Sequence, residues 1–198
     1  MENSIENNTK SSMQSNAKNN TKSNTQNNVR NNHLTMRRAQ AGDLTLIQEL
    51  IRGLAVYEKR PQDVTGTKEQ LRYWLFEKNI ATVWLAEYDK ETAGYALYYP
   101  VFGSFAAAGS VYLEDFYLKE EFRGRGLGRH FFSKIAEAVL AEGYIGMEWS
   151  CLDWNQTAIG FYRRGEAKQE TGRVYFGLDH AGLEKTAEQN LCEGSGIT

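Results

Sequence analysis

The chain has 198 residues and a formal net charge of −2 at neutral pH. This length suits one domain with a substantial apolar core, and the slight negative charge argues against a general nucleic-acid binder, which usually presents a basic face. No apolar run reaches the roughly 20 residues that span a bilayer, and no signal-peptide pattern is present, so we expect no membrane association. Cys151 and Cys192 are far apart in sequence, so we expect no framework disulfide and a cytoplasmic protein.

The domain boundaries follow from composition. Residues 1–32 are rich in Asn, Ser, Thr and Lys and contain almost no apolar side chains. Such a segment cannot bury enough surface to offset the entropy of ordering, so it is predicted to be a disordered tail. One globular domain is expected over residues 33–183, followed by a C-terminal tail over residues 184–198.

The first half of the domain is predicted to contain one strand, two helices and a β-hairpin. Asp43 precedes apolar residues at helical spacing, and Thr67 with Gln70 forms a capping box for the second helix. The alternating segments on either side of Asp89 predict the hairpin. In chain order these elements are the strand 34–38, the helices 43–58 and 67–79, and the strands 81–88 and 93–99.

The second half is predicted to continue the sheet and to contain one βαβ unit. A strand over 111–118 leads into a Gly-rich turn and an amphipathic helix over 126–141, which Gly143 ends. A parallel strand over 145–152 follows, then a short helix from Asn155 and a closing strand over 173–178. The predicted fold class is α/β, a mixed and mostly antiparallel sheet flanked by helices.

The most informative motif is Arg123-x-x-Gly126-x-Gly128, between a strand and a helix. The N-terminus of a helix carries unpaired N–H groups and partial positive charge, so this turn is expected to hold a phosphate or pyrophosphate. A nicotinamide dinucleotide site is the alternative, although the motif is GxGxG and lies in the middle of the chain. A P-loop would require Gly-Lys-Ser/Thr, which is absent here.

The chain resembles the GCN5-related N-acetyltransferase (GNAT) superfamily, and within it the spermidine/spermine (diamine) acetyltransferases. The resemblance rests on Leu54-Ala-Val-Tyr-Glu58, Gly94-Tyr-Ala-Leu-Tyr-Tyr99, Tyr112-Leu-Glu-Asp-Phe116, the Arg-x-x-Gly-x-Gly run and Trp154-Asn-x-x-Ala-Ile-x-Phe-Tyr162. It implies a GNAT-type acyl-CoA N-acyltransferase fold whose sheet splays to admit acetyl-CoA, the acetyl-donor cosubstrate. It also implies acetyl transfer to a primary amine of a small molecule, a diamine, polyamine or lysine-like amine.

The resemblance also implies roles for individual residues. The acetyl and pantetheine part of acetyl-CoA would be bound by the backbone of Phe116, Tyr117 and Leu118. Its pyrophosphate would be bound by Arg123, Gly124, Arg125, Gly126, Leu127, Gly128 and Arg129. The cofactor would also face Asn155, Gln156, Thr157 and Ala158. The amine pocket would be lined by Tyr57, Glu58, Glu114, Glu148, Trp149 and Ser150. The general acid that protonates the departing thiolate would be Tyr162.

Chemistry gives independent reasons for two of these roles. A model amine with a pKa of about 10.4 is protonated at pH 7 and must lose a proton before it attacks, which favours a carboxylate base. Glu114 and Asp115 are neighbours on a strand, so only one is expected to face the cleft; we favour Glu114, on the face of Phe116. A phenol such as Tyr162 can protonate a thiolate, although a Tyr beside Phe161 also suits packing, and Asn155 also suits helix capping.

Three further expectations concern ligands and assembly. His33, His130 and His180 form no metal-ligand spacing with the cysteines, so no metal site is predicted. By analogy with relatives, a homodimer is expected. The alternative function is a non-catalytic acyl-CoA-binding sensor or interaction domain on the same fold, because a fold does not fix a function.

Overall fold

The computed structural model describes residues 33–192, so the predicted N-terminal tail lies outside the described residues. The chain divides into two compact units, Met1–Ser150 and Cys151–Thr198. The elements of the first unit are β1 (Leu34–Arg38), η1 (Ala41–Asp43), α2 (Leu44–Tyr57), η2 (Pro61–Asp63), α3 (Lys68–Arg72), the π-helical turn η3 (Tyr73–Glu77), β2 (Thr82–Tyr88), β3 (Glu91–Gly103), β4 (Ala108–Leu118), η4 (Glu120–Phe122), α4 (Leu127–Ala141) and β5 (Met147–Glu148).

The five strands form one mixed sheet in the order β1-β2-β3-β4-β5. The first three pairings are antiparallel, and β4 pairs with β5 in parallel through the crossover helix α4. This arrangement confirms the predicted fold class and the predicted βαβ unit. β3 and β4 are longer than expected, because their pairing continues to Gly103↔Ala108, so the segment between the predicted strands 93–99 and 111–118 forms the end of a hairpin.

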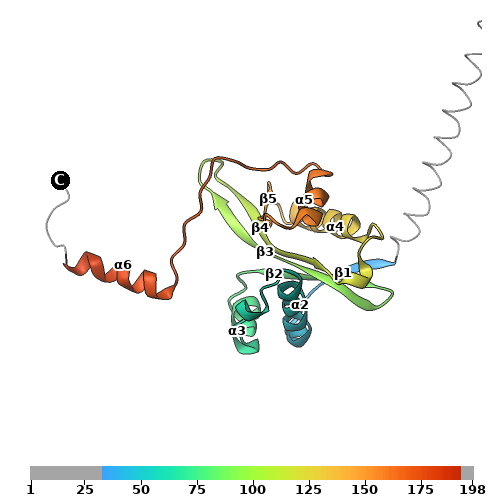
Figure 1. Ribbon diagram of the computed structural model, residues 1–198, viewed down its shortest axis with the longest axis horizontal. Coiled ribbons are helices and arrows are strands. Elements are labelled where there is room, and N and C mark those ends of the chain that lie inside the picture. The colour runs from blue at the N-terminus through green and yellow to red at the C-terminus, as the bar shows by residue number, and fades with distance from the viewer. Residues whose placement is uncertain (1–32, 193–198) are drawn as a thin grey trace, which may run out of the picture. The chain divides into compact units, whose positions relative to one another are not determined.

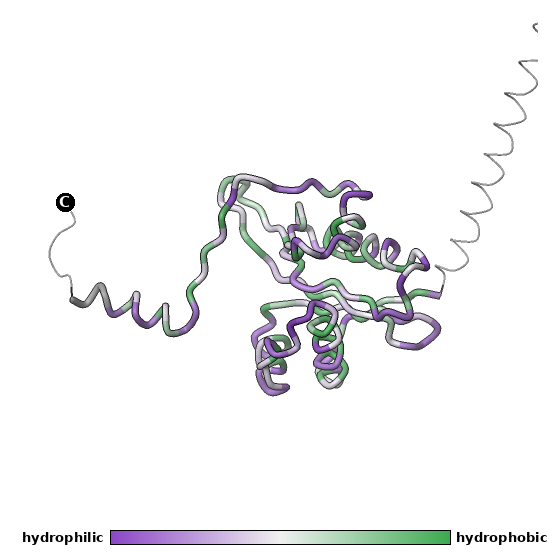
Figure 2. Tube along the Cα trace, viewed as in Figure 1, coloured by the Kyte–Doolittle hydropathy of each residue, from purple (hydrophilic) through white to green (hydrophobic). Residues whose placement is uncertain are grey.

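The sheet is covered on both faces, by α2 and α3 on one side and by α4 on the other (Figure 1). On the α4 side the apolar core includes Phe131 and Ile135 of the helix, both without solvent exposure. On the α2 side a second cluster forms around Ile47 and Tyr95, which are also fully buried. The alternation of apolar and polar residues that produces these two cores can be followed along the helices in Figure 2.

The helix starts follow local capping rules with one exception. Thr67 accepts the backbone N–H of Gln70, whose side chain returns to the Thr67 N–H, so the predicted capping box is confirmed. The exception is Asp43, which makes no side-chain cap on α2 and instead accepts the Gln40 N–H and pairs with Arg37. The side chain therefore ties β1 to the start of the helical layer.

The second unit contains α5 (Gln156–Arg163) and α6 (His180–Cys192). Two strand predictions in the C-terminal half of the chain need correction. The strand expected over 145–152 is shortened to β5, because only Met147 and Glu148 pair with β4. The strand expected over 173–178 is absent, because its backbone pairs with no strand of the described residues. None of the helices in residues 33–192 is long and apolar enough to cross a membrane.

Candidate active site

A β-bulge at Glu114 determines how β4 presents its carboxylates. The β3–β4 register runs Leu97↔Asp115 and then Tyr98↔Leu113, so Glu114 is the extra residue of the strand. As a result Glu114 and Asp115 line the same pocket on the α2 side, while Phe116 packs against the core on the α4 side. The expectation that only one carboxylate faces the cleft, and that Glu114 shares the face of Phe116, is therefore wrong. Strict alternation along a strand fails where a residue bulges.

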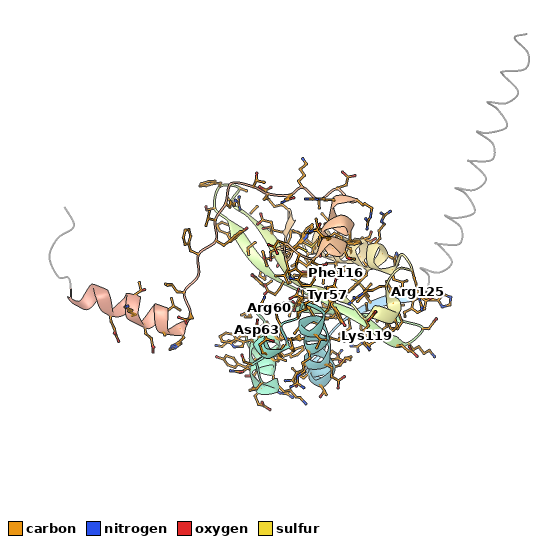
Figure 3. The ribbon with its side chains drawn as sticks, in the orientation of Figure 1. Tyr57, Arg60, Asp63, Phe116, Lys119 and Arg125 are labelled. Atoms are coloured by element: carbon orange, nitrogen blue, oxygen red, sulfur yellow. The ribbon has the colours of Figure 1, made fainter. Side chains whose placement is uncertain are left out.

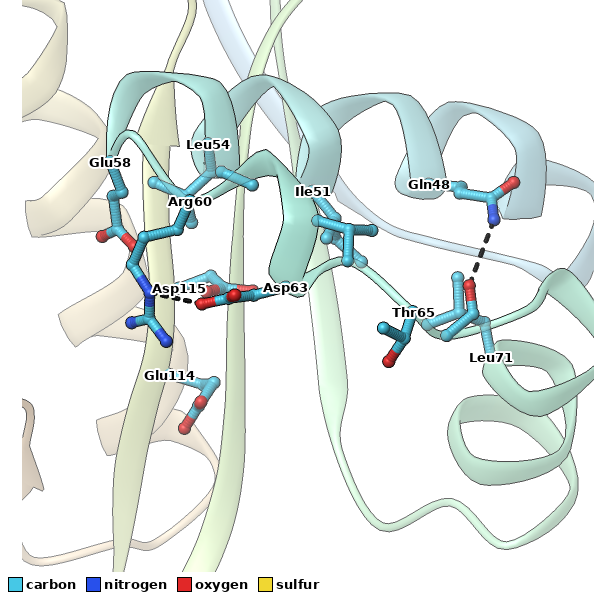
Figure 4. A pocket seen from close by; sticks show the side chains of 13 residues that line it. Gln48, Ile51, Leu54, Glu58, Arg60, Asp63, Thr65, Leu71, Glu114 and Asp115 are labelled. Carbon is cyan, nitrogen blue, oxygen red and sulfur yellow. Dashed lines mark hydrogen bonds and ion pairs between the residues drawn. The ribbon is translucent and has the colours of Figure 1, made fainter.

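The pocket has a volume of about 340 Å³ and lies between the end of α2, the η2 turn and β4 (Figure 4). Its acidic side chains are Glu58, Asp63, Glu114 and Asp115, and its one guanidinium is that of Arg60. The apolar side chains that line it are Ile51, Leu54, Ala55, Val64 and Leu71. A pocket with an apolar wall and four carboxylates is suited to a cationic molecule with a hydrocarbon chain.

The end of α2 places two of these carboxylates. The helix ends at Tyr57, and Lys59 takes a positive φ of 61° that reverses the chain direction. Pro61 then begins the short η2 turn, which carries Asp63 back toward Arg60. Figure 3 shows Arg60 and Asp63 on the side of the sheet covered by α2 and α3, with Phe116 on the opposite side. Arg60, Asp63 and Asp115 were not among the predicted site residues, although opposite charges three apart after Glu58 were a usable signal.

The carboxylates of the pocket influence one another. Burial raises the pKa of Asp115 to about 6, and the charges of Glu114 and Glu58 add to the increase, while a hydrogen bond from Tyr95 opposes it. Burial also raises the pKa of Glu58, with Arg60 lowering it and Glu114 raising it. A cation entering the pocket would relieve this repulsion. Within residues 33–192 no group of three His, Cys, Asp or Glu side chains is arranged to hold a metal ion.

Four residues predicted for the amine pocket lie elsewhere. The ring of Tyr57 lies under the guanidinium of Arg123, and Trp149 packs edge-on against Phe132 on the α4 side, with ring centroids 5.3 Å apart. Glu148 of β5 pairs with Tyr112 of β4, and Ser150 accepts a 2.9 Å hydrogen bond from the Tyr112 hydroxyl. Glu58 and Glu114 are the two predicted residues that do line the pocket.

The Gly-rich turn has the conformation that an anion site requires. Gly124 and Gly126 adopt φ values of 72° and 80°, which glycine tolerates best, and a Cβ at either residue would meet open space. Gly126 is the N-cap of α4, so the first N–H groups of that helix point out of its N-terminus. Arg125 and Arg129 are exposed beside it. These features fit a pyrophosphate.

Arg123 has a different environment from the other arginines of the turn. Its Nε donates a 2.8 Å hydrogen bond to the carbonyl of Leu118. Its guanidinium lies 4.3 Å from the ring centre of Tyr57 and 5.4 Å from that of Tyr117. The side chain therefore joins the end of α2 to the end of β4 through hydrogen-bond and cation–π contacts.

The C-terminal half of β4 has an open side. In the described chain β5 pairs with β4 only at Val111 and Tyr112, while β3 follows the strand to Leu118. Beyond Tyr112, β4 therefore pairs with no strand of the described residues on the side away from β3. The splay of the sheet that would admit acetyl-CoA stays a prediction. Gly94 allows β3 to approach β4 closely near Tyr117, since a Cβ at Gly94 would lie 2.0 Å from the Tyr117 carbonyl oxygen.

In the second unit, α5 carries the remaining predicted residues. Its N-cap Asn155 is 7% exposed and accepts the Ala158 N–H at 3.1 Å, which confirms the capping interpretation of that residue. Gln156, Thr157 and Ala158 form the first turn, and Tyr162 lies near the end of the helix, its ring 5.2 Å from that of Phe161.

Comparison with known proteins identifies the fold. The acetyltransferase (GNAT) family matches residues 47–165, more than half of the chain. The chain belongs to the GNAT acetyltransferase family. A thialysine N-epsilon-acetyltransferase from Sus scrofa is 34% identical over 145 residues, which are 69% of this chain and 85% of that protein. A spermidine/spermine N(1)-acetyltransferase-like protein 1 from Homo sapiens is 28% identical over 66% of this chain and 20% of its own length.

Solved structures agree on the fold of this GNAT protein. An aminoglycoside acetyltransferase from an uncultured soil metagenomic sample, in complex with sisomicin, superimposes with a TM-score of 0.65 at 18% identity, over 75% of this chain and 98% of its own. The family match and the two relatives confirm the resemblance expected from the motifs. The chain is an N-acetyltransferase of this family, whose members take the acetyl group from acetyl-CoA.

Proposed function

We propose that the amine substrate binds in the acidic pocket and is acetylated at the open side of β4 by acetyl-CoA held at the Gly-rich turn. The observation that carries this proposal is that one strand borders both sites. Glu114 and Asp115 line the pocket, and β4 then runs through Phe116 to Leu118 toward the turn that begins at Arg123. A nitrogen in the pocket would therefore lie beside the strand on which the thioester is placed.

The chemistry assigns one role to each group. Glu114 would accept the proton of the substrate ammonium, directly or through water, while Asp115 and Glu58 hold its positive charge. Backbone N–H groups of Phe116 to Leu118 would polarise the thioester carbonyl. The nitrogen forms a bond to the acetyl carbon and the carbon–sulfur bond breaks. Tyr162, the general acid that the resemblance implies, would protonate the departing thiolate, and the proton that the nitrogen loses as the amide forms would restore the phenol. The turn from Gly124 to Arg129 would bind the pyrophosphate of the cofactor.

The assay that tests this proposal is release of free CoA thiol from acetyl-CoA with a panel of diamines, polyamines and lysine-like amino acids. Glu114→Gln is expected to lower kcat/KM by roughly 10²-fold, the range typical of general base catalysis, because the amide cannot accept a proton. Glu49→Gln is the matched control, since Glu49 is exposed on α2 and does not line the pocket. Acetyl-CoA binding without amine-dependent thiol release would instead establish a non-catalytic acyl-CoA sensor.

We also propose a homodimer. Val174, Tyr175, Phe176 and Leu178 expose between 57% and 94% of their surface in a segment that forms no strand. Such a β-favouring apolar segment would be covered by a second copy of the chain. Sedimentation equilibrium measures the mass directly, and a purely monomeric protein at micromolar concentration would contradict the proposed dimer. The cytoplasmic location expected from the sequence stays a prediction.

A further inference from the structure

Arg60 is the one basic side chain among the residues that line the acidic pocket. Its Nε pairs with Oδ2 of Asp63 at 2.6 Å, and the two side chains remain 54% and 46% exposed (Figure 4). Within residues 33–192 the two terminal nitrogens of Arg60 and the second carboxylate oxygen of Asp63 hold no hydrogen bond. The terminal N–H groups of the Arg60 guanidinium can therefore donate to a ligand, and the second oxygen of the Asp63 carboxylate can accept from it.

The turn after α2 is built to place this pair. Arg60 donates its backbone N–H to Ala55, and Asp63 donates its own to the Arg60 carbonyl, so both residues are fixed to the end of the helix. The positive φ of Lys59 and the Pro61 ring restrict the backbone on either side of Arg60. Because the backbone is held on both sides of Arg60, the Arg60 and Asp63 side chains lose little conformational entropy when they bind a ligand.

A guanidinium does not help to bind a pure diamine or polyamine. It reduces the negative potential of the pocket and repels the second ammonium of such a substrate. It does help to bind a substrate that carries a carboxylate, which the other acids of the pocket would repel. The terminal edge of a guanidinium matches a carboxylate in a two-point hydrogen bond.

From these contacts we propose that Arg60 and Asp63 together bind the α-carboxylate and α-ammonium of an amino acid whose distal amine reaches Glu58, Glu114 and Asp115. Arg60 binds the carboxylate, Asp63 accepts from the α-ammonium, and the side-chain methylenes lie against the wall formed by Ile51, Leu54 and Leu71. This proposal rests on the proposed function and makes Arg60 the residue that selects lysine-like amino acids over diamines.

The test uses substrates that differ only by the carboxylate. Lysine is paired with 1,5-diaminopentane and ornithine with 1,4-diaminobutane, and kcat/KM is measured for each with saturating acetyl-CoA. The native enzyme is expected to prefer the amino acid of each pair. Arg60→Leu should lower the ratio of the amino-acid kcat/KM to the diamine kcat/KM by at least about tenfold, the loss expected for a charge-assisted contact. Asp63→Asn should lower the amino-acid rate more than the diamine rate.

A ratio between two substrates on one enzyme sample is insensitive to partial unfolding, so a structural role of Arg60 would not move it. Arg52→Leu is the matched control, because Arg52 is an exposed arginine on α2 that does not line the pocket. A ratio within twofold of the native value in Arg60→Leu, or a native preference for diamines, would overturn this inference. Failure of the proposed function is distinguishable, because then none of the four amines would release CoA thiol.

Discussion

The hydroxyl of Tyr95 on β3 donates a 2.9 Å hydrogen bond to Oδ2 of Asp115 on β4. Tyr95 is fully buried, and Asp115 is half-buried at the edge of the acidic pocket. Burial raises the pKa of Asp115 to about 6, while this hydrogen bond holds the pKa lower than it would otherwise be. The hydrogen bond therefore lowers the pH at which Asp115 becomes ionised.

Tyr95→Phe removes that hydrogen bond and should raise the pKa of Asp115 further. Because an ionised Asp115 attracts the substrate ammonium, the acid limb of the kcat/KM profile is expected near pH 6 in the native enzyme and about one pH unit higher in the variant. Tyr98→Phe is the control, since its buried hydroxyl contacts Glu142 and Trp84 instead. An acid limb that does not move upward in Tyr95→Phe would contradict this role.

The raised pKa of Asp115 also affects stability. A carboxyl with a higher pKa in the folded than in the unfolded protein keeps its proton longer when folded, so its contribution to stability falls as pH rises from about 4 to about 6. A shift from 3.8 to about 6 corresponds to at most about 3 kcal/mol. Asp115→Asn should abolish this decline and gain stability relative to the native protein at pH 7, as measured by urea unfolding at pH 4 and pH 7. Equal pH dependence in the two proteins would refute the assignment.

Tyr162→Phe should lower turnover while leaving acetyl-CoA affinity nearly unchanged. Loss of a general acid typically costs 10²- to 10⁴-fold in rate, whereas the phenyl ring that packs beside Phe161 is retained. Stopped-flow turnover together with calorimetric binding of acetyl-CoA separates the two quantities. Tyr73→Phe, a change at a partly exposed tyrosine on η3, should alter neither. Equal losses of turnover and affinity in Tyr162→Phe would show a structural role.

Gly94→Ala should destabilise the protein and reduce cofactor binding. The added Cβ would lie 2.0 Å from the Tyr117 carbonyl oxygen, so β3 and β4 must separate where β4 is proposed to hold the thioester. We expect a loss of about 3 kcal/mol or more in the free energy of unfolding, measured by urea titration. Gly42→Ala is the matched control, because a Cβ there meets open space at an ordinary φ. A loss no larger than that of the control would be inconsistent with this close approach.

Arg123→Lys should weaken binding of the amine as well as of acetyl-CoA. The lysine keeps the charge but loses the Nε contact to Leu118 and the planar stacking on Tyr57 that connects α2 to β4. Both KM values are expected to rise by roughly tenfold, the cost of one charged hydrogen bond. Arg125→Lys, at an exposed arginine of the same turn, should affect only acetyl-CoA. If Arg123→Lys also affects only acetyl-CoA, the residue acts as a phosphate ligand and not as a link between sites.

The sequence contained enough local information to predict most elements. The capping box at Thr67, the cap at Asn155 and the apolar spacing of α2 and α4 depend on neighbours within one or two helical turns, so they can be read without the fold. Strands in the C-terminal part of the chain could not be predicted as well from the sequence. The lengths of β5 and of the 173–178 segment depend on whether a distant strand pairs with them, and propensity alone carries no such information.

By itself the sequence determined the mixed sheet, the helix-opening glycine turn and the family, because periodicity, caps and contiguous motifs are local properties. Only the tertiary structure decided the composition of the acidic pocket. The bulge that turns Glu114 and Asp115 to one side exists only in the register with β3, and Arg60 and Asp63 reach the pocket only because α2 packs on that face. Contacts between segments far apart in sequence depend on how those segments pack, and that packing cannot be read from any short stretch of the chain.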